Sequence, residues 1–171
     1  TDADKKPEDL NDYSLYAGTS WFFVNPQMHQ SLDYLFIDEA GQVALGTTIA
    51  NATSAKNLVL IGDQMQLSQP IRAKHNGYAR KSSLDFVLEN LDTIPPEKGI
   101  FLNTTRRLNK KICKFISDSF YESRLNSHEV ATSRSVKLKL EPIKDEGIFY
   151  VPIDHNGCSQ RSDEEADLVE K

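Results

Sequence analysis

Two acidic residues, Asp38 and Glu39, directly follow a hydrophobic run that ends at Ile37. Carboxylate oxygens suit Mg²⁺, and a neighbouring carboxylate can accept a proton from an attacking water. Adjacent positions at the end of a strand project differently, so they can divide these two tasks. The other interpretation is a solvated turn, which an acidic pair after a strand also forms.

A second polar segment, G-D-Q-M-Q-L at residues 62–67, follows the next hydrophobic run. If the two runs are neighbouring strands, Asp63 lies beside the acidic pair as a cofactor-binding residue. Gln66 can then bond a terminal phosphate or the attacking water. The alternative is a polar loop in which Gly62 supplies a turn. Because both segments follow strands of one unit, the sequence favours a site for nucleotide hydrolysis.

The elements that must position these residues form a strand–helix–strand unit. Residues 33–37 (D-Y-L-F-I) and 57–61 (N-L-V-L-I) are short apolar runs without alternation, typical of strands covered on both faces. From residue 42 onward, Leu45, Ile49 and Ala52 recur at helical spacing. Such a unit implies a parallel sheet, which binds ligands at the carboxyl ends of its strands.

Further elements are expected on either side of this unit. Trp21, with Phe22 and Phe23, is interpreted as core rather than as a platform for stacking bases. Strands are predicted at residues 99–102 (G-I-F-L) and 147–153 (G-I-F-Y-V-P-I). A helix is predicted after a cap at Ser82 or Ser83, and its shared face consists of Leu84, Val87, Leu88 and Leu91. A second helix is predicted to run to about Tyr121, with one face formed by Leu108, Ile112, Phe115 and Phe120. A last helix is predicted after the capping box that begins at Ser162.

The composition is that of a globular protein, with 39% hydrophobic and 26% charged residues among 171. A net charge of −5 and a pI near 5.4 give the chain as a whole no field that attracts nucleic acid, although residues 106–114 form a local basic cluster. Cys113 and Cys158 have neither metal-site nor disulfide spacing, which fits a reducing cytosol. No apolar run approaches the roughly 20 residues of a membrane span. We expect a cytoplasmic protein, of the bacterial cytoplasm or nucleoid, with no membrane partner.

The order of three motifs resembles the superfamily 1 helicases, in the branch of the nonsense-mediated-decay helicase and its bacterial and DNA-repair relatives. The motifs are IDEAGQ (residues 37–42), GDQMQLSQP (62–70) and FLNTTRRLNKKICKFISDSFYESRL (101–125). The resemblance implies an α/β fold with a partial RecA-like P-loop NTPase parallel sheet. Residues 1–95 would be the later part of the first lobe, and residues 96–171 the linker and the beginning of the second.

The resemblance also implies roles for individual residues of the first lobe. Asp38 would bind Mg²⁺, and Glu39 would be the general base. Gln42 and Gln66 would sense the γ-phosphate of ATP and couple it to the nucleic-acid track. Thr19 would contact the nucleic acid.

In the second lobe the register of the third motif places Arg107, rather than Arg106, at the γ-phosphate arginine. An arginine there would stabilise charge on a transferred phosphoryl group, whereas the alternative for both residues is a solvent-facing first turn. Glu165 matches an acidic residue of the second lobe loosely and would bind the cofactor. Thr105 and Arg106 replace a Gln-Tyr pair of the family, which removes its base-contacting or stacking role. Lysines 110, 111 and 114 are interpreted as a solvated face rather than as a contact with a nucleic-acid backbone.

The phosphate-binding loop G-x-x-x-x-G-K-[ST] does not occur in this sequence. Without it no lysine and no nest of backbone N–H groups holds the β- and γ-phosphates. We therefore expect an internal fragment of a longer ATP- and Mg²⁺-dependent helicase or translocase, inactive alone, whose partners are ATP, single-stranded DNA or RNA and the remaining segments of the same helicase.

Two alternatives remain open at this point. The chain could be a non-enzymatic α/β scaffold or interaction module derived from a helicase. It could also be a phosphotransfer domain in which Asp38 or Asp63 is phosphorylated. The second alternative requires a strand-end lysine, and none follows residues 99–102 or 147–151.

Overall fold

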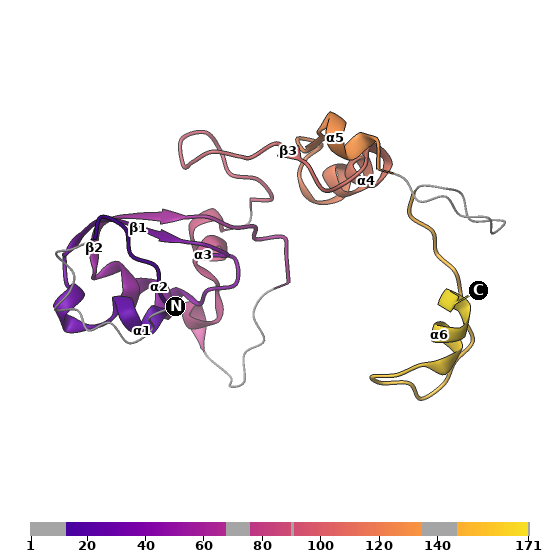
Figure 1. Cartoon of the computed structure of the whole chain (residues 1–171), viewed down its shortest axis with the longest axis horizontal. Coiled ribbons are helices and arrows are strands. Elements are labelled where there is room, and N and C mark those ends of the chain that lie inside the picture. Colours follow the sequence, from indigo (N-terminus) through magenta and orange to yellow (C-terminus); the bar gives the residue numbers. More distant parts are fainter. Residues whose placement is uncertain (1–12, 68–75, 90, 135–146, 171) are drawn as a thin grey trace. The chain divides into compact units, whose positions relative to one another are not determined.

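The computed structural model describes residues 13–67, 76–89, 91–134 and 147–170 (Figure 1). The chain divides into two compact units, Thr1–Phe101 and Leu102–Lys171. Over the described ranges, none of the helices has the length and apolar character needed to cross a membrane.

The first unit is built on a two-stranded parallel sheet. Strand β1 (Leu32–Ile37) pairs with β2 (Ala55–Leu60), and helix α2 (Leu45–Ala52) connects them. The predicted strand–helix–strand unit and its parallel sheet are therefore confirmed. The helix begins later than residue 42 because Ala44 is still extended, forming an antiparallel bridge to Ser82.

Short helices complete the first unit. They are α1 (Ser20–Phe23), η2 (Pro26–Met28), η3 (Gly77–Arg80) and α3 (Ser83–Leu88). The predicted cap of α3 is confirmed, because Ser82 Oγ accepts a hydrogen bond from Asp85 N (3.1 Å) while Ser82 N donates to Asp85 Oδ2 (3.3 Å). The helix ends at Leu88 because Glu89 leaves the helical region, with φ of 57°.

The core of the first unit lies on one face of the sheet. Leu35 and Ile37 of β1 are buried there against Leu84 of α3, together with Ala40 and Ala55. The prediction that both faces of β1 are covered is wrong, because Tyr34 and Phe36 are 59% and 62% exposed. Successive strand residues point to opposite faces, so Tyr34 and Phe36 form the uncovered side.

The second unit contains another parallel pair. Strand β3 (Thr104–Thr105) pairs with β4 (Asn126–Ser127), and α4 (Lys110–Phe120) connects them. A four-residue helix, α5 (Glu129–Thr132), follows β4. The strand predicted at residues 99–102 is wrong, because the backbone pairing with β4 begins further along the chain, where Asn126 N donates to Asn103 O (2.8 Å).

Helix α4 is confirmed, although it begins at Lys110, after Leu108, and the hydrophobic residues predicted to share one face are not all buried. Phe115 and Phe120 are 54% and 40% exposed, whereas Cys113 and Ser117 are buried. Ser117 Oγ accepts a hydrogen bond from Leu125 N (2.9 Å), and Cys113 Sγ donates to Leu125 O (3.6 Å). Burial raises the pKa of the Cys113 thiol, so the helix packs with a neutral thiol and a hydroxyl against the chain that leads to β4.

Helix α6 (Asp163–Glu170) confirms the last predicted helix, and Ser162 Oγ caps it by accepting from Glu165 N (3.2 Å). The Glu165 carboxylate pairs with His155 Nε2 (2.9 Å). The strand predicted at residues 147–153 is wrong, because this segment adopts no regular strand structure. Its hydrophobic residues include Tyr150, which is 91% exposed, and the segment joins neither of the two sheets that the described residues form.

Candidate functional site

The acidic pair lies in a loop that leaves β1 and immediately rejoins the sheet. Ile61 N donates to Ile37 O (2.9 Å), and Ala40 N donates to Ile61 O (2.8 Å). Asp38 and Glu39 therefore bulge out between two sheet hydrogen bonds, and both are exposed. The two hydrogen bonds on either side of the acidic pair therefore fix the backbone from which these carboxylates project.

Glu39 turns the chain. It has a φ of 52°, in the left-handed region that non-glycine residues rarely adopt. Two hydrogen bonds hold this turn, because Asp38 Oδ1 accepts from Glu39 N (2.9 Å) and Glu39 O accepts from Gln42 N (2.7 Å). One oxygen of the Asp38 carboxylate is thus oriented by the backbone, and Gln42 is tied to the same turn.

The loop after β1 touches the loop after β2 backbone to backbone. A Cβ added to Gly41 would lie 2.4 Å from the Asp63 carbonyl oxygen, and one added to Gly62 would lie 2.7 Å from Ala40 N. Only glycine permits this approach. The structure therefore brings the backbones of the two polar segments together, as expected from their places after neighbouring parallel strands.

Asp63 organises the second loop. Its Oδ1 accepts a hydrogen bond from Met65 N (3.0 Å), and its Oδ2 accepts from Gln66 Nε2 (3.1 Å). Gln66 is held next to the Asp63 carboxylate by this bond. Gln64 lies between Asp63 and Met65 in the sequence. Its side chain anchors the loop elsewhere, because its Nε2 donates a hydrogen bond to Asp92 O (2.6 Å).

The buried hydroxyl of Ser83 holds the acidic loop by hydrogen bonds to its backbone. Ser83 is 1% exposed, and its Oγ lies 3.0 Å from Ala40 O and 3.2 Å from Val43 O while accepting a hydrogen bond from Thr48 Oγ1 (3.0 Å). Ser83 N donates to Val43 O as well (3.0 Å). The first turn of α3 therefore holds the backbone that follows the acidic pair at two points, Ala40 and Val43.

Replacing Ser83 with alanine is expected to lower the free energy of unfolding by about 1–3 kcal/mol, because buried carbonyl and hydroxyl groups lose their partner. Ser133→Ala is the matched control. The Ser133 hydroxyl bonds to Val130 O on an exposed surface, so its loss should cost less than about 0.5 kcal/mol. Urea denaturation followed by circular dichroism measures both values, and equal effects would contradict the supporting role of Ser83.

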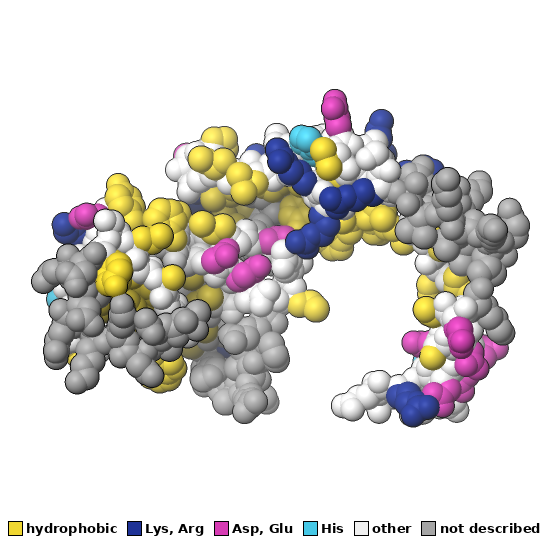
Figure 2. Space-filling view, viewed as in Figure 1, with side chains coloured by type: hydrophobic (Ala, Val, Ile, Leu, Met, Phe, Trp, Pro, Cys, Tyr) yellow, Lys and Arg dark blue, Asp and Glu magenta, His cyan; other side chains and the backbone are white. Residues whose placement is uncertain are grey.

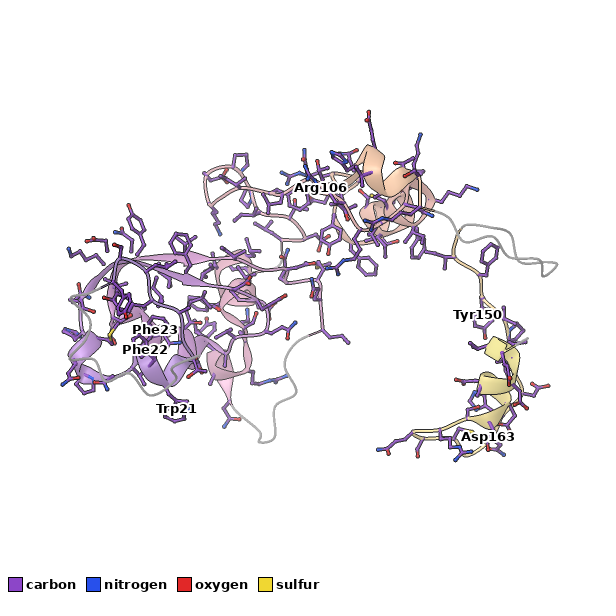
Figure 3. All side chains as sticks on the ribbon, in the orientation of Figure 1. Trp21, Phe22, Phe23, Arg106, Tyr150 and Asp163 are labelled. Carbon is purple, nitrogen blue, oxygen red and sulfur yellow. The ribbon has the colours of Figure 1, made fainter. Side chains whose placement is uncertain are left out.

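In the second unit, Arg106 (Figure 3) and its neighbour Arg107 follow the carboxyl end of β3. Thr105 Oγ1 accepts from Arg107 N (3.2 Å) and from Leu108 N (3.4 Å), which shapes this loop before α4 begins. Both arginines are exposed. Figure 2 shows lysine and arginine side chains gathered over this unit, in agreement with the basic cluster at residues 106–114.

The remaining predicted residues lie in separate local settings. Thr19 precedes α1 as its N-cap residue, is exposed, and accepts a hydrogen bond from Phe22 N (3.0 Å) through its carbonyl. Glu165 makes the helix-capping and His155 contacts of α6. These contacts join residues within the same local segment of the chain.

The carboxylates of this site suit a metal ion whose ligands come mainly from a bound nucleotide. Within the described ranges, no group of three or more His, Cys, Asp or Glu side chains is arranged to hold a metal ion. Mg²⁺ bound with a nucleotide needs only one or two protein carboxylates, because phosphates and water supply its other ligands. The exposed Asp38 carboxylate, oriented by Glu39 N, meets that requirement.

Three features that shape this site do not follow from the sequence analysis. Gly41 and Gly62 lie where the backbones of the two loops come too close for a side chain. A glycine next to the end of a strand is the usual sequence signal for such a contact. Ser83 is predicted only as a candidate cap, yet its hydroxyl holds the acidic loop. Nothing in the sequence distinguishes a serine that caps a helix from one that binds a loop from another part of the chain.

Comparisons with known proteins identify the family to which the chain belongs. Residues 19–170 match the family described as the viral superfamily 1 RNA helicase core domain. The chain is also 30% identical over 142 residues to the DNA polymerase alpha-associated DNA helicase A of Schizosaccharomyces pombe. That similarity covers 81% of this chain but 20% of the yeast protein, so the chain spans about a fifth of the length of the relative it matches. The chain belongs to the viral superfamily 1 RNA helicase core domain family.

Proposed function

We propose that this chain supplies the metal-binding and hydrolytic carboxylates of an ATP-dependent superfamily 1 helicase or translocase. One observation carries the proposal: the loop with Asp38 and Glu39 and the loop with Asp63 meet backbone to backbone at the carboxyl ends of two parallel strands. Ligands bind at this edge in open α/β sheets. Because the chain belongs to a helicase family, we propose that the ligand at this edge is a nucleoside triphosphate.

Each carboxylate has a separate task in this proposal. Asp38 holds Mg²⁺, which when bound would neutralise charge on the terminal phosphates. Glu39 accepts the proton of the attacking water. Gln66 is held by Asp63 and positions that water or a γ-phosphate oxygen, and Gln42, tied to the Glu39 turn, senses the same phosphate.

Three further residues extend the proposal beyond the acidic loops. Arg107 contacts the terminal phosphate and stabilises the charge that develops on it during transfer. Thr19 contacts the nucleic acid, and Glu165 contributes to cofactor binding. Arg107 and Thr19 are exposed, as direct contact with a ligand requires.

We further propose that the chain is part of a longer protein with two RecA-like lobes. Its place would be in the branch that includes the nonsense-mediated-decay and DNA-repair helicases. The absence of a G-x-x-x-x-G-K-[ST] loop supports this proposal, because the phosphate cradle has to come from another segment. By itself the chain should hydrolyse ATP negligibly, since phosphoryl transfer depends almost entirely on positioning and charge stabilisation.

The rival proposal is a non-enzymatic scaffold that retains the helicase fold. The rate of ATP hydrolysis by the longer protein distinguishes the two, measured alone, with single-stranded RNA and with single-stranded DNA. We expect a single strand of at least one kind to raise the rate several-fold. A rate that neither strand changes, or an absence of hydrolysis, would favour the scaffold.

A further inference from the structure

Helix α1 presents the one tryptophan of the sequence to solvent. Trp21 is 85% exposed, and Figure 3 shows its side chain pointing away from the ribbon of this unit. Phe23 packs against the core, and Phe22 stacks on Tyr16 with ring centroids 6.4 Å apart. The prediction that Trp21 belongs to the core with these phenylalanines is therefore wrong.

The turn that carries Trp21 is fixed to the rest of the unit. Ser20 Oγ accepts a hydrogen bond from the buried Asn51 Nδ2 (3.1 Å), which connects α1 to α2. Within α1, Val24 N donates to Ser20 O (3.1 Å). Anchors on both sides of the indole hold its backbone in place, so a ligand that stacks on the ring does not have to order this segment first.

The surroundings of Trp21 suit a polyanion that carries flat rings. Residues 13–31 and 42–55, which include α1 and α2, contain no Asp or Glu, although the chain has 25 acidic residues. Phosphates can therefore approach this surface without repulsion from carboxylates of these two segments. Thr19 and Ser20, two polar residues, directly precede the ring in the sequence.

We propose that Trp21 stacks on a nucleobase of the single strand that the helicase binds, next to the contact proposed at Thr19. The inference rests on the proposed function, because it needs a single-stranded nucleic acid as partner. It adds a base contact to a site for which the sequence suggested only one threonine. Base–aromatic stacking tolerates any sequence, because every base has a flat face.

The test uses the 171-residue chain, in which all tryptophan fluorescence comes from Trp21. A fluorescein-labelled strand of uridines reports binding by anisotropy, and the unlabelled strand is titrated against tryptophan emission. We expect binding to quench the emission and to protect Trp21 from acrylamide. A strand of the same length with abasic sites keeps the phosphate charge, and we expect it to bind more weakly and leave the emission unchanged.

Variants separate a stacking contact from a general effect on the surface. Trp21→Ala should weaken binding by about 5- to 150-fold, the range expected from losing one stacked base, and Trp21→Phe should restore most of it. Leu15→Ala is the matched control, since Leu15 is also 85% exposed in this unit, and it should leave affinity unchanged. Thermal melts check that each variant is folded.

The outcomes distinguish the inference from the proposed function. A wild-type chain that binds the strand without a change at Trp21, or a Trp21→Ala variant that binds as tightly as wild type, overturns the stacking contact alone. A wild-type chain that binds no single strand even at low salt overturns the stacking contact. If the longer protein also binds none, the proposed function falls with it.

Discussion

Glu39→Gln in the longer protein is expected to reduce nucleic-acid-stimulated ATP turnover by about 10²- to 10⁴-fold, the usual contribution of a general base. Glutamine keeps the size and polarity of the side chain but cannot take up a proton. The turn should survive, because its hydrogen bonds involve the backbone N and O of residue 39 and the Asp38 carboxylate. Steady-state hydrolysis at saturating nucleic acid measures the effect.

Nucleotide affinity provides the internal check on the Glu39→Gln result. Because Glu39 is assigned to the water and not to the metal, the dissociation constant of Mg²⁺–ADP should change less than about threefold, far less than turnover. Glu97→Gln, the same change at an exposed residue of this unit, should leave both quantities unaffected. Wild-type turnover in Glu39→Gln would show that Glu39 is not the general base.

Gly41→Ala is expected to separate the two loops of the site and to lower the free energy of unfolding by about 1–3 kcal/mol, as overpacking does. The added Cβ would lie 2.4 Å from the Asp63 carbonyl oxygen, a backbone atom that cannot move without the loop. The longer protein with this change should also lose most ATP turnover, because the carboxylates on the two loops are displaced from each other. Chemical denaturation and steady-state hydrolysis measure the two effects.

Gly46→Ala is the matched control for this steric argument. Gly46 lies in α2, and a Cβ added there meets no atom within 4 Å. Alanine is the better helix former, so this change should raise the free energy of unfolding by about 0.5–1 kcal/mol. If Gly41→Ala behaves like Gly46→Ala, the close contact between the loops is not a feature of the folded protein.

The parts of the fold that can be predicted correctly from the sequence are those with strong local signals. Continuous apolar runs indicate β1 and β2, and the Ser82 cap indicates α3. The order of strand, helix and strand then requires a parallel sheet, which places the loops after the two strands side by side. The juxtaposition of the polar segments therefore follows from the order of these elements along the chain.

The errors occur where contacts from distant residues decide the outcome. The run at 99–102 looks like a strand, yet Ile100 is 84% exposed and the pairing begins at Thr104. Hydrophobicity alone assigns Trp21 to the core, but only the packing of its two neighbours determines which ring faces inward. The contact between Ser83 and the acidic loop joins residues 43 positions apart, beyond the reach of any periodicity.

Metal binding at Asp38 tests the central claim most directly. Mn²⁺ replaces Mg²⁺ in such sites and is visible by electron paramagnetic resonance, so its affinity can be measured in the longer protein with ADP present. We expect Asp38→Asn to weaken Mn²⁺ binding at least about tenfold, since a neutral amide replaces a hard anionic ligand. Asp92→Asn, a change at an exposed aspartate of the same unit, should leave it unchanged. Equal Mn²⁺ affinity in wild type and Asp38→Asn would show that the acidic loop is not the metal site.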